Sequence, residues 1–513
     1  MTSISNRFIL FSIGLWFAVQ PSYLHPDEHF QSLEILCDKF YNYKGFVPWE
    51  FESKHAARSF IPLYIFYGPL LCGLRPLLKW HLIEQPLTIL RIIRIQNYLV
   101  YTIVCHFALK AINVKHGNRS AAELFVISSY ITWSYQSHSF SNSIETILLL
   151  AVLALFTKFV ERKSGEHENQ YKKSFLLGTL ITLGTFNRIT FAGFILLPFV
   201  SLFLRFYCGQ WRSFFVLIIS IITCSVTFVC FDTAIYQSSS YVVAPINNLL
   251  YNLDESNLAL HGIHPRITHM FVNLPQIVGP GIILLPNAFR SFSKVCENQA
   301  ALSVLSGMTF LSLFKHQELR FLTPLAPLLF SCFIPRSPFK RLKWEYIFRA
   351  WFLFNLIAGL IMGVLHQGGI LRAINDFHKN ESPINVHIWW KTYSPPAWMY
   401  RNKNLTVSAM NTVNGVESID EIPFHVVNNH VIDLRGSNLE LLIKSLIHFE
   451  NAGASVTLIA PNSMRVLLNS MQDTTNFRLE RLAEWKLHLD LDHIDFSNPS
   501  SLALGLASYN VSS

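Results

Sequence analysis

Two adjacent carboxylates, Asp27 and Glu28, follow the first apolar segment of the chain, within the stretch SYLHPDEHFQSLEILCDKF that begins at Ser22. A carboxylate beside a membrane span is costly to desolvate and therefore usually marks function. One such group could take a proton from a hydroxyl. The plainer alternative is a solvated cap at a helix start, because acidic residues favour helix N-termini and Pro26 suits a first helical turn.

The loop that carries this pair, at residues 21–60, is longer than a connector needs to be, and long ordered loops are often functional. Its second half, GFVPWEFESKHAARSFIP, adds Trp49, Glu50 and Arg58. Paired carboxylates, an arginine and exposed aromatic rings fit a site for a sugar hydroxyl and an anionic leaving group. In such a site one carboxylate takes a proton while cations stabilise a departing phosphate.

The composition of the 513-residue chain is that of a membrane protein. Hydrophobic residues make up 51% and charged residues only 14%, whereas a soluble chain averages roughly 25% charged residues. A helix that crosses a membrane needs about 20 apolar residues, and the apolar runs of the sequence predict about 10 to 12 transmembrane helices. The candidate spans are Phe8–Val19, Phe60–Leu74, Ile92–Ala111, Leu124–Ser137, Ile144–Phe159, Phe175–Leu204, Phe214–Ala234, Val278–Pro286, Ala300–Phe314, Phe321–Phe333 and Tyr346–Leu365.

The net charge of +9 comes from basic residues in short loops between these runs, such as VERKSGEHENQYKK. This is the positive-inside bias of a polytopic protein, and we expect no nucleic-acid partner. Strict alternation from a cytosolic N-terminus nevertheless places that loop in the lumen. Either one segment does not cross or two have merged, and Phe60–Leu74, which contains two prolines and a glycine, is the first suspect. Eight scattered cysteines predict neither a disulfide framework nor a zinc site.

The apolar spans end near residue 370, which predicts a membrane domain at 1–370 and a small soluble domain at 371–513. HVVNNHVIDLRG and ASVTLIAP alternate like strands, and LELLIKSLIHFENAG is patterned as an amphipathic helix, so the second domain is α/β. N-glycosylation patterns at Asn380, Asn404 and Asn510 favour a lumenal position. The aromatic stretch WWKTYSPPAWMY fits a glycan-contacting wall or, more ordinarily, anchoring at the membrane interface.

Several motifs, in order along nearly the whole membrane region, carry a resemblance to a known family. HPDEHFQSLE, followed by WEF and RS, resembles the first lumenal loop of the dolichyl-phosphate-mannose-dependent mannosyltransferases of the GT-C superfamily, glycosyltransferase family 22. Further matching stretches are SNSIET, FNRIT, HGIHPRITHMFVNLP, FKHQELRFL and HQGGI. The resemblance implies an α-helical polytopic membrane protein of GT-C type in the endoplasmic reticulum, with its active site facing the lumen.

The resemblance also implies an enzyme, an α-1,2-mannosyltransferase that moves mannose from dolichyl-phosphate-mannose to the third mannose of a GPI-anchor precursor. His25 and Arg266 favour members that add the fourth GPI mannose over those that add the third. A sister enzyme for the third GPI mannose or for the N-glycan lipid precursor stays open, as does a non-catalytic complex subunit. A transporter is a further alternative, but it would be expected to show repeat-related halves with broken helices.

A β-linked donor and an α-linked product imply inversion in a single displacement. We expect Asp27 to be the base, because Pro26 stiffens the backbone before this short side chain. Neighbouring residues on a helix diverge by roughly 100°, so Glu28 would instead orient the base or the acceptor. His25 and His29 are candidates for substrate binding, although a histidine in such a loop is more often simply hydrogen-bonded.

For the leaving phosphate we choose Lys315, His316 and Arg320 of FKHQELRFL; on a helix, His316 and Arg320 are four residues apart and share a face. The alternative is a basic cap beside the membrane. Further substrate-binding candidates in family-like motifs are Trp49, Glu50, Arg58, Arg188, His264 and Arg266. We expect neither a metal nor a cofactor, since the lipid-linked donor is itself a substrate; the other partners are the glycolipid acceptor and membrane lipids.

Overall fold

The computed structural model describes residues 4–512 except 113–118, 162–168, 255–256, 258–261, 290, 334–340, 380–385, 411–415, 417, 423–428 and 496. The chain divides into two compact units, each made of three separate segments. The first unit comprises Met1–Ala18, Glu50–Pro69 and Arg94–Ile357, and the second comprises Val19–Trp49, Leu70–Ile93 and Ala358–Ser513. The second unit therefore joins the acidic motif to the C-terminal residues.

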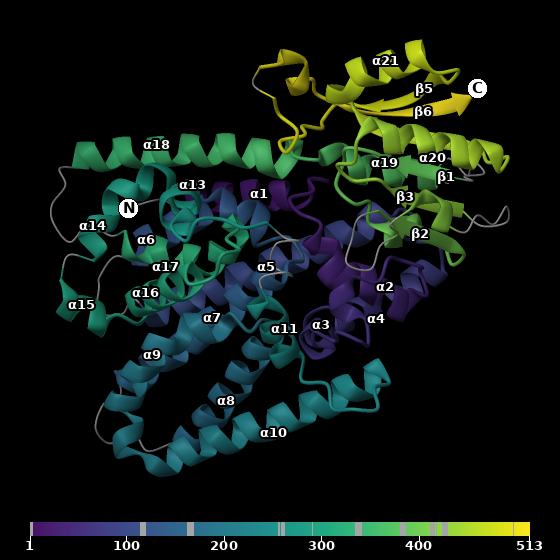
Figure 1. Cartoon of the computed structure of the whole chain (residues 1–513). Coiled ribbons are helices and arrows are strands. Elements are labelled where there is room, and N and C mark those ends of the chain that lie inside the picture. The colour runs from purple at the N-terminus through teal and green to yellow at the C-terminus, as the bar shows by residue number, and fades with distance from the viewer. Residues whose placement is uncertain are drawn as a thin grey trace. The chain divides into compact units, whose positions relative to one another are not determined.

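The first unit is a set of apolar helices (Figure 1). Its helices are α1 (Ile4–Ala18), α3 (Phe60–Phe66), α6 (Arg119–Ile127), α7 (Ser141–Val160), α8 (Gln170–Asn187), α9 (Phe191–Arg205), α10 (Trp211–Tyr236), α11 (Ala244–Leu253), α13 (Leu274–Val278), α14 (Leu285–Ala288), α15 (Phe292–Glu297), α16 (Gln299–Ser312) and α17 (Ala326–Cys332). Three further helices, α4 (Gly68–Lys79), α5 (Pro86–Ile112) and α18 (Arg341–Leu360), include residues of both units.

Within the described residues, five helices are long and apolar enough to cross a membrane: Pro86–Ile112, Ser141–Val160, Phe191–Gly209, Trp211–Tyr236 and Glu345–Leu365. The pair α3 and α4, bent by 59°, adds a sixth if it forms one broken span. Shorter apolar helices account for further predicted spans: Asn6–Ala18, His269–Leu284, Gln299–Ser312 and Leu319–Cys332. The prediction of a single span at Phe175–Leu204 is wrong, because the chain breaks at Arg188 between α8 and α9.

Polar side chains hold neighbouring helices of this unit together. α8 lies beside α10, and the hydroxyl of Ser220 on α10 donates to the carbonyl of Phe175 on α8 at 2.7 Å. Such interhelical hydrogen bonds are effective between apolar helices, where burial of further apolar surface gives little preference for one neighbour. The packing of α8 fixes where its C-terminal end, with Asn187 and Arg188, is placed.

The second unit contains a six-stranded sheet that confirms the predicted C-terminal α/β domain. Its strands are β1 (Val386–Trp389), β2 (Leu405–Ala409), β3 (Asn429–Asp433), β4 (Val456–Pro461), β5 (Arg478–Trp485) and β6 (Leu506–Ser512), in the order β2-β3-β1-β4-β6-β5. The first four are parallel, and β6 is antiparallel to both neighbours. The helices are α19 (Gly368–Lys379), α20 (Leu439–Asn451) and α21 (Arg465–Thr474). Figure 1 shows α20 beside the parallel part and α21 near β5 and β6.

The core of this domain forms where the alternating apolar residues of the strands meet α20. Ile388, Ile432 and Leu458 of adjacent strands are fully buried against Leu446 and Phe449 of α20. Burial of such side chains contributes roughly 1.5–3 kcal/mol each. The pattern read from HVVNNHVIDLRG, LELLIKSLIHFENAG and ASVTLIAP therefore corresponds to β3, α20 and β4.

The aromatic stretch WWKTYSPPAWMY does not anchor the chain at a membrane interface. Trp389, Trp390 and Trp398 are all fully buried, whereas an interfacial anchor keeps its ring among lipid headgroups. The stretch instead packs on the acidic loop of its own unit, where the Tyr23 hydroxyl donates to the carbonyl of Ser394 at 2.8 Å. The interpretation of this stretch as an anchor at the membrane interface is therefore wrong.

Candidate active site

The acidic motif begins a helical segment immediately after Pro26, whose carbonyl accepts the main-chain N–H groups of His29 and Phe30. The segment continues as a π-helical turn, His29–Leu33, and then as α2 (Glu34–Tyr41). Short π-helical turns inside helices occur frequently at functional sites. The structure thus confirms a helix start here, but this alone does not separate a catalytic pair from a cap.

Exposure separates the two carboxylates. The Asp27 side chain is 23% exposed and that of Glu28 is fully buried. Asp27 Oδ2 accepts from Gln31 Nε2 at 2.6 Å, and Oδ1 lies 3.6 Å from His25 Nδ1. Neighbours on a helix diverge, and here Asp27 is the member of the pair that a substrate can reach.

Glu28 lies in a buried polar cluster with His29. Its Oε2 is 3.9 Å from Nε2 of His29, and both side chains are fully buried. The indole N–H of Trp398 donates to Nδ1 of His29 at 3.2 Å. His29 is therefore held between a carboxylate of its own loop and an indole of the C-terminal domain.

A third carboxylate, Glu34 at the start of α2, ties the acidic loop to the same stretch of the C-terminal domain. It accepts the main-chain N–H of Phe46 at 2.9 Å, of Ala397 at 3.1 Å and of Trp398 at 3.4 Å. Burial raises the pKa of Glu34 to about 8, and these three hydrogen bonds oppose that rise. Its role is to hold segments together, because it is almost completely buried.

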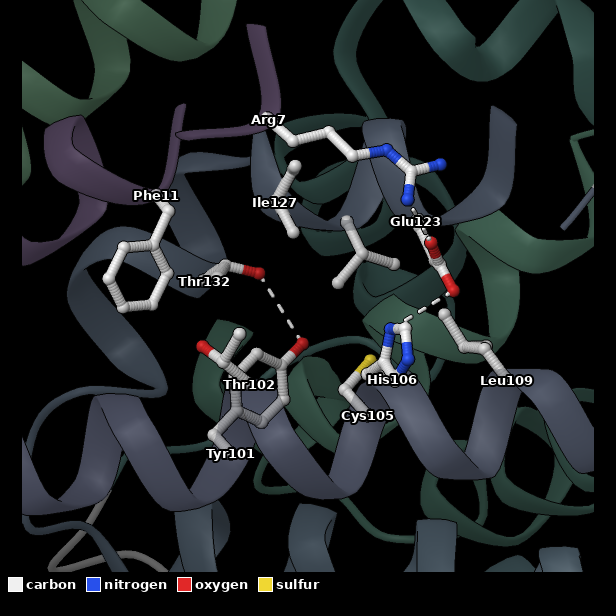
Figure 2. Close-up of a pocket in the computed structure, with 11 residues that line it drawn as sticks. Arg7, Phe11, Tyr101, Thr102, Cys105, His106, Leu109, Glu123, Ile127 and Thr132 are labelled. Atoms are coloured by element: carbon white, nitrogen blue, oxygen red, sulfur yellow. Dashed lines mark hydrogen bonds and ion pairs between the residues drawn. The ribbon is translucent and has the colours of Figure 1, made fainter. Parts of the chain in front are cut away.

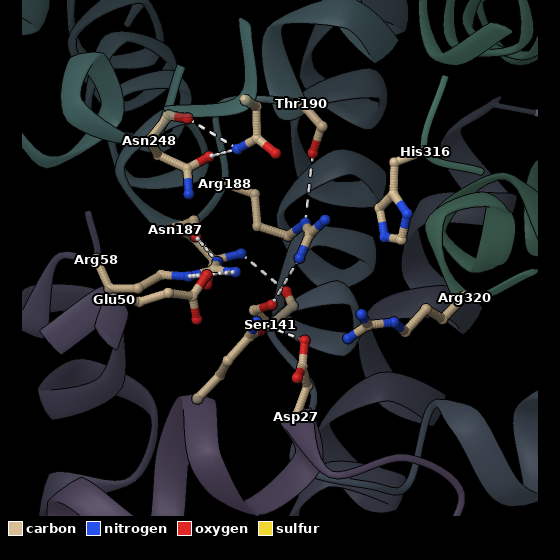
Figure 3. Close-up of polar contacts among 12 residues, drawn as sticks. Asp27, Glu50, Arg58, Ser141, Asn187, Arg188, Thr190, Asn248, His316 and Arg320 are labelled. Carbon is tan, nitrogen blue, oxygen red and sulfur yellow. Dashed lines mark hydrogen bonds and ion pairs between the residues drawn. The ribbon is translucent and has the colours of Figure 1, made fainter. Parts of the chain in front are cut away.

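Three arginines from distant segments, Arg58, Arg188 and Arg320, lie in the first unit, and Figure 3 shows them together with Glu50, the partner of Arg58. Each of the three pairs with a glutamate. Arg58 Nη2 lies 2.9 Å from Glu50 Oε1, and Arg188 Nε lies 3.2 Å from Glu145 Oε2. Arg320 makes a two-pronged pair with Glu318. We call this set, Arg58, Arg188, Arg320 and their glutamates Glu50, Glu145 and Glu318, the arginine cluster.

Helix ends position the cluster. Asn187, the last residue of α8, donates through Nδ2 to the carbonyl of Ser141, the first residue of α7, at 2.8 Å. Arg188 Nη1 donates to the Ser141 hydroxyl at 3.0 Å, and Thr190 donates to Glu145 at 2.7 Å. Buried polar groups are costly unless paired, so these contacts fix the guanidinium where α8 breaks.

Contacts across the cluster show that the arginines are neighbours. Arg58 Nη1 donates to the carbonyl of Asn187 at 3.4 Å, one residue before Arg188. The guanidinium carbons of Arg188 and Arg320 each lie 5.3 Å from the ring centroid of Phe321, within the range of a cation–π interaction. The three guanidinium groups are therefore neighbours. Glu50, Glu145 and Glu318 balance their positive charges.

The predicted helical face shared by His316 and Arg320 is wrong. Residues 316–318 are irregular, and Arg320 lies in a 3₁₀ helix, Leu319–Leu325. The two side chains are joined instead by Glu318, which lies 2.7 Å from His316 Nε2. Burial opposes protonation of His316, but the pairing with Glu318 outweighs it and raises the pKa of His316. His316 therefore adds a fourth potential cation beside Arg320.

The remaining predicted residues are placed less centrally. His264 lies near His316, with ring centroids 6.0 Å apart, and its main-chain N–H donates to the carbonyl of Lys315. Arg266 is exposed, and only its carbonyl, which accepts from Gln317, has a polar contact among the described residues. Trp49 is half-buried. The structure therefore brings Arg58, Arg188 and Arg320 together but does not bring Arg266 to them.

The sequence reasoning missed several residues that complete these sites. Glu145, Ser141, Asn187 and Thr190 all stand in SNSIET and FNRIT, two motifs that were noted without assigning a role to those residues. An acidic residue inside a 20-residue apolar helix such as α7 was the available signal for Glu145. No local signal pointed to Trp398, because its contact with His29 spans 369 positions.

A separate cavity of about 170 Å³ opens between α1, α5 and α6 (Figure 2). Glu123 pairs there with Arg7 at 3.1 Å and with His106 at 3.3 Å. None of the predicted site residues lines it. In the described part of the chain, no group of three or more His, Cys, Asp or Glu side chains is arranged to hold a metal ion.

The predicted glycosylation positions differ in their surroundings. Asn404 is exposed just before β2, whereas Asn510 is half-buried in β6, which pairs with strands on both sides. Asn380 lies outside the described residues.

The apolar helices, several of them long enough to span a membrane, are those of a multi-pass membrane protein. The fold agrees: ArnT from Cupriavidus metallidurans, whose crystal structure was obtained bound to undecaprenyl phosphate, superposes with a TM-score of 0.57 over 99% of this chain and 98% of that chain, at 10% identity. This likeness shows the GT-C fold.

The chain belongs to the Alg9-like mannosyltransferase family, whose profile matches residues 7–402. It is 43% identical to GPI mannosyltransferase 4 of Candida glabrata over 98% of this chain and 99% of that protein. It is also 43% identical to GPI mannosyltransferase 4 of Saccharomyces cerevisiae, over 98% of both chains. The protein of the same name from Yarrowia lipolytica is 34% identical over 96% of both. Membership of this family confirms a glycosyltransferase and does not favour the transporter alternative.

Proposed function

We propose that this enzyme transfers mannose from dolichyl-phosphate-mannose to the third mannose of a GPI-anchor precursor, in α-1,2 linkage, at the lumenal face of the endoplasmic reticulum membrane. The observation that carries the proposal is the similarity over nearly the full chain to proteins named GPI mannosyltransferase 4. The partly exposed carboxylate of Asp27 could supply the base, and the arginine cluster could supply the cations, that such a transfer needs.

In the proposed reaction, Asp27 takes the proton of the acceptor 2-hydroxyl as its oxygen attacks the anomeric carbon of mannose. The bond between that carbon and the phosphate oxygen breaks on the opposite side, which inverts the β linkage of the donor to an α linkage. The bonding electrons leave with dolichyl phosphate. A phosphate already ionised needs cations more than an acid, and Arg58, Arg188 and Arg320 are the candidates to stabilise it.

The arginine–glutamate pairs suit this role because they hold the guanidinium groups in fixed orientations before the donor arrives. Preorganised donors lose little free energy to reorientation when charge develops on the leaving group. Arginine also presents its N–H groups in a planar fork that matches phosphate oxygens. We assign no metal or cofactor to the reaction, since neither the nucleophile nor the leaving group requires one in this scheme.

Lipid analysis after depletion of the protein tests the proposed acceptor. Cells that lack the enzyme should accumulate a GPI precursor bearing three mannoses, and re-expression of the wild-type chain should remove it. Accumulation of a precursor with two mannoses would assign the enzyme to the third-mannose step instead. A normal GPI profile with a truncated N-glycan lipid precursor would assign it to the sister pathway.

A further inference from the structure

We propose that Trp398 is a positioning residue of the acidic motif: its indole N–H, donated at 3.2 Å to Nδ1, holds His29 as the neutral tautomer that carries its proton on Nε2. A nitrogen that accepts a hydrogen bond has no proton of its own. The proton is then on Nε2, the nitrogen that faces Glu28 Oε2 at 3.9 Å. The inference rests on the proposed role of Asp27 and extends it to the C-terminal domain.

The position of Trp398 is fixed at both its main chain and its side chain. Its main-chain N–H and that of Ala397 donate to Glu34 at 3.4 Å and 3.1 Å, and its ring is fully buried. Pro395 and Pro396 precede it and restrict the backbone. An indole held in this way directs its N–H at one point, which is the requirement for selecting one histidine tautomer.

The surroundings of His29 explain why its charge matters. Tyr23 meets the His29 ring edge-on at 5.0 Å. Burial raises the pKa of this tyrosine, and the charges of Glu34, Glu28 and Asp433 add to that rise. Tyr393 packs edge-on against the same tyrosine at 5.6 Å. A protonated His29 would pair with one of these carboxylates in place of its contact with Trp398.

Protonation of His29 would also disturb the adjacent base. Two residues from Asp27, an imidazolium would lower the basicity of that carboxylate and draw Glu28 out of its orientation. Because Nδ1 is occupied by the indole N–H, the protonated form of His29 is disfavoured. The motif therefore keeps the same geometry across the pH range in which a free histidine, with a pKa near 6.5, would change charge.

The test compares the pH dependence of turnover for two full-length variants in detergent, with dolichyl-phosphate-mannose and a three-mannose GPI acceptor. Trp398→Phe removes the donor to His29. Trp390→Phe is the matched control, since it is equally buried in the same domain and loses one indole donor, to the carbonyl of Ser437 at 3.0 Å. A histidine freed to titrate near pH 6.5 is about ten-elevenths protonated at pH 5.5.

We expect the ratio of Trp398→Phe to Trp390→Phe turnover to fall about tenfold between pH 7.5 and pH 5.5. In the double variant Trp398→Phe, His29→Gln that fall should disappear, because glutamine does not titrate. A ratio that stays constant with pH would overturn the proposal.

The single variant His29→Gln keeps the test decisive if Trp398→Phe does not fold. Whatever its turnover at pH 7.5, the ratio of its turnover to that of wild type should be the same at pH 5.5, because glutamine does not titrate; loss of turnover as large as that of Asp27→Asn would instead make His29 itself an acid or base and overturn the positioning role. Failure of the underlying function is distinguishable, since it would appear as an active Asp27→Asn protein in the same assay.

Discussion

Asp27 and Glu28 are neighbours in the chain, yet the fold leaves the first carboxylate partly exposed and buries the second. The same contrast separates Arg320, which is paired in the arginine cluster, from Arg266, which is exposed away from it. Residue types and motifs predicted which side chains are candidates for the active site. Helix geometry predicted that the side chains of Asp27 and Glu28 point in different directions. Which arginines converge depends on contacts between α7, α8 and the segment at 316–325, and these are invisible in local sequence.

Substitution of Arg320 tests the phosphate role at the scale of one residue. Arg320→Ala should lose turnover by about 10²-fold or more, as removal of one preorganised donor typically does. Arg320→Lys should restore only part of it, because a point charge replaces a planar two-pronged donor. The measurement is steady-state mannose transfer at matched protein abundance.

The control for Arg320 is Arg266→Ala, which changes the same residue type at an exposed position and should stay within about threefold of wild type. Equal activity of the Arg320→Ala, Arg320→Lys and wild-type proteins would remove Arg320 from the site.

At the scale of elements, the HQGGI stretch forms the junction between the membrane segment and the sheet domain within the second unit. The main-chain N–H of Gln367 donates to the carbonyl of Leu489, and that of Leu489 donates to the carbonyl of Leu365. α19 begins at Gly368, where a Cβ atom would lie 2.8 Å from the carbonyl oxygen of Leu487. Backbone atoms cannot move aside as a flexible side chain can, so this approach requires glycine.

Alanine substitutions in two helices test that junction. Gly368→Ala should destabilise the protein by about 1–3 kcal/mol, the usual cost of overpacking. Gly73→Ala, in α4 of the same unit, should be neutral or stabilising by up to about 1 kcal/mol, because nothing lies within 4 Å of a Cβ atom there. Thermal unfolding in detergent measures both, and an equal effect of the two substitutions would contradict the assigned close approach.

Elements were predictable from the sequence where one pattern dominated. The apolar runs of α7 and α10 and the alternation of β3 and β4 each matched the structure. The break at Arg188 was not predicted, because apolar residues continue on both sides of it. The irregular segment at 316–318 was not predicted either, because His316 and Arg320 are four residues apart and would also fit one face of a helix. In both places an ion pair, Arg188 with Glu145 and Arg320 with Glu318, stabilises a non-helical backbone that the hydrophobic periodicity does not indicate.

For the whole molecule, the arrangement requires the acidic motif and the sheet domain to be on one side of the membrane. Both belong to one compact unit, joined by the contacts of Glu34 and Trp398. A lumenal active site therefore implies a lumenal sheet domain. This connection could not be predicted from the sequence, which suggested a boundary at residue 370, because it depends on contacts between residues more than 360 positions apart.

Glycosylation reports the side on which the sheet domain lies. We expect Asn404 to carry a glycan in the wild-type protein, because it is exposed and a lumenal domain meets the glycosylation machinery. The Asn404→Gln protein should migrate faster on a gel than wild type, and deglycosylation should no longer remove a glycan from position 404. Asn510→Gln should leave mobility unchanged, since Asn510 lies in a strand paired on both sides.

Cytosolic labelling of a cysteine introduced at Lys44 in intact microsomes would contradict a lumenal site.

The most direct test of the central claim is mannose transfer from dolichyl-phosphate-mannose by the purified Asp27→Asn protein, measured beside Glu28→Gln. Loss of a general base typically lowers turnover 10²- to 10⁴-fold. The turnover of Asp27→Asn should therefore fall by at least about 10²-fold while donor binding is largely kept. Glu28→Gln, which changes a buried carboxylate, should lose less. An active Asp27→Asn protein with a more damaged Glu28→Gln protein would contradict the assignment of Asp27 as the base.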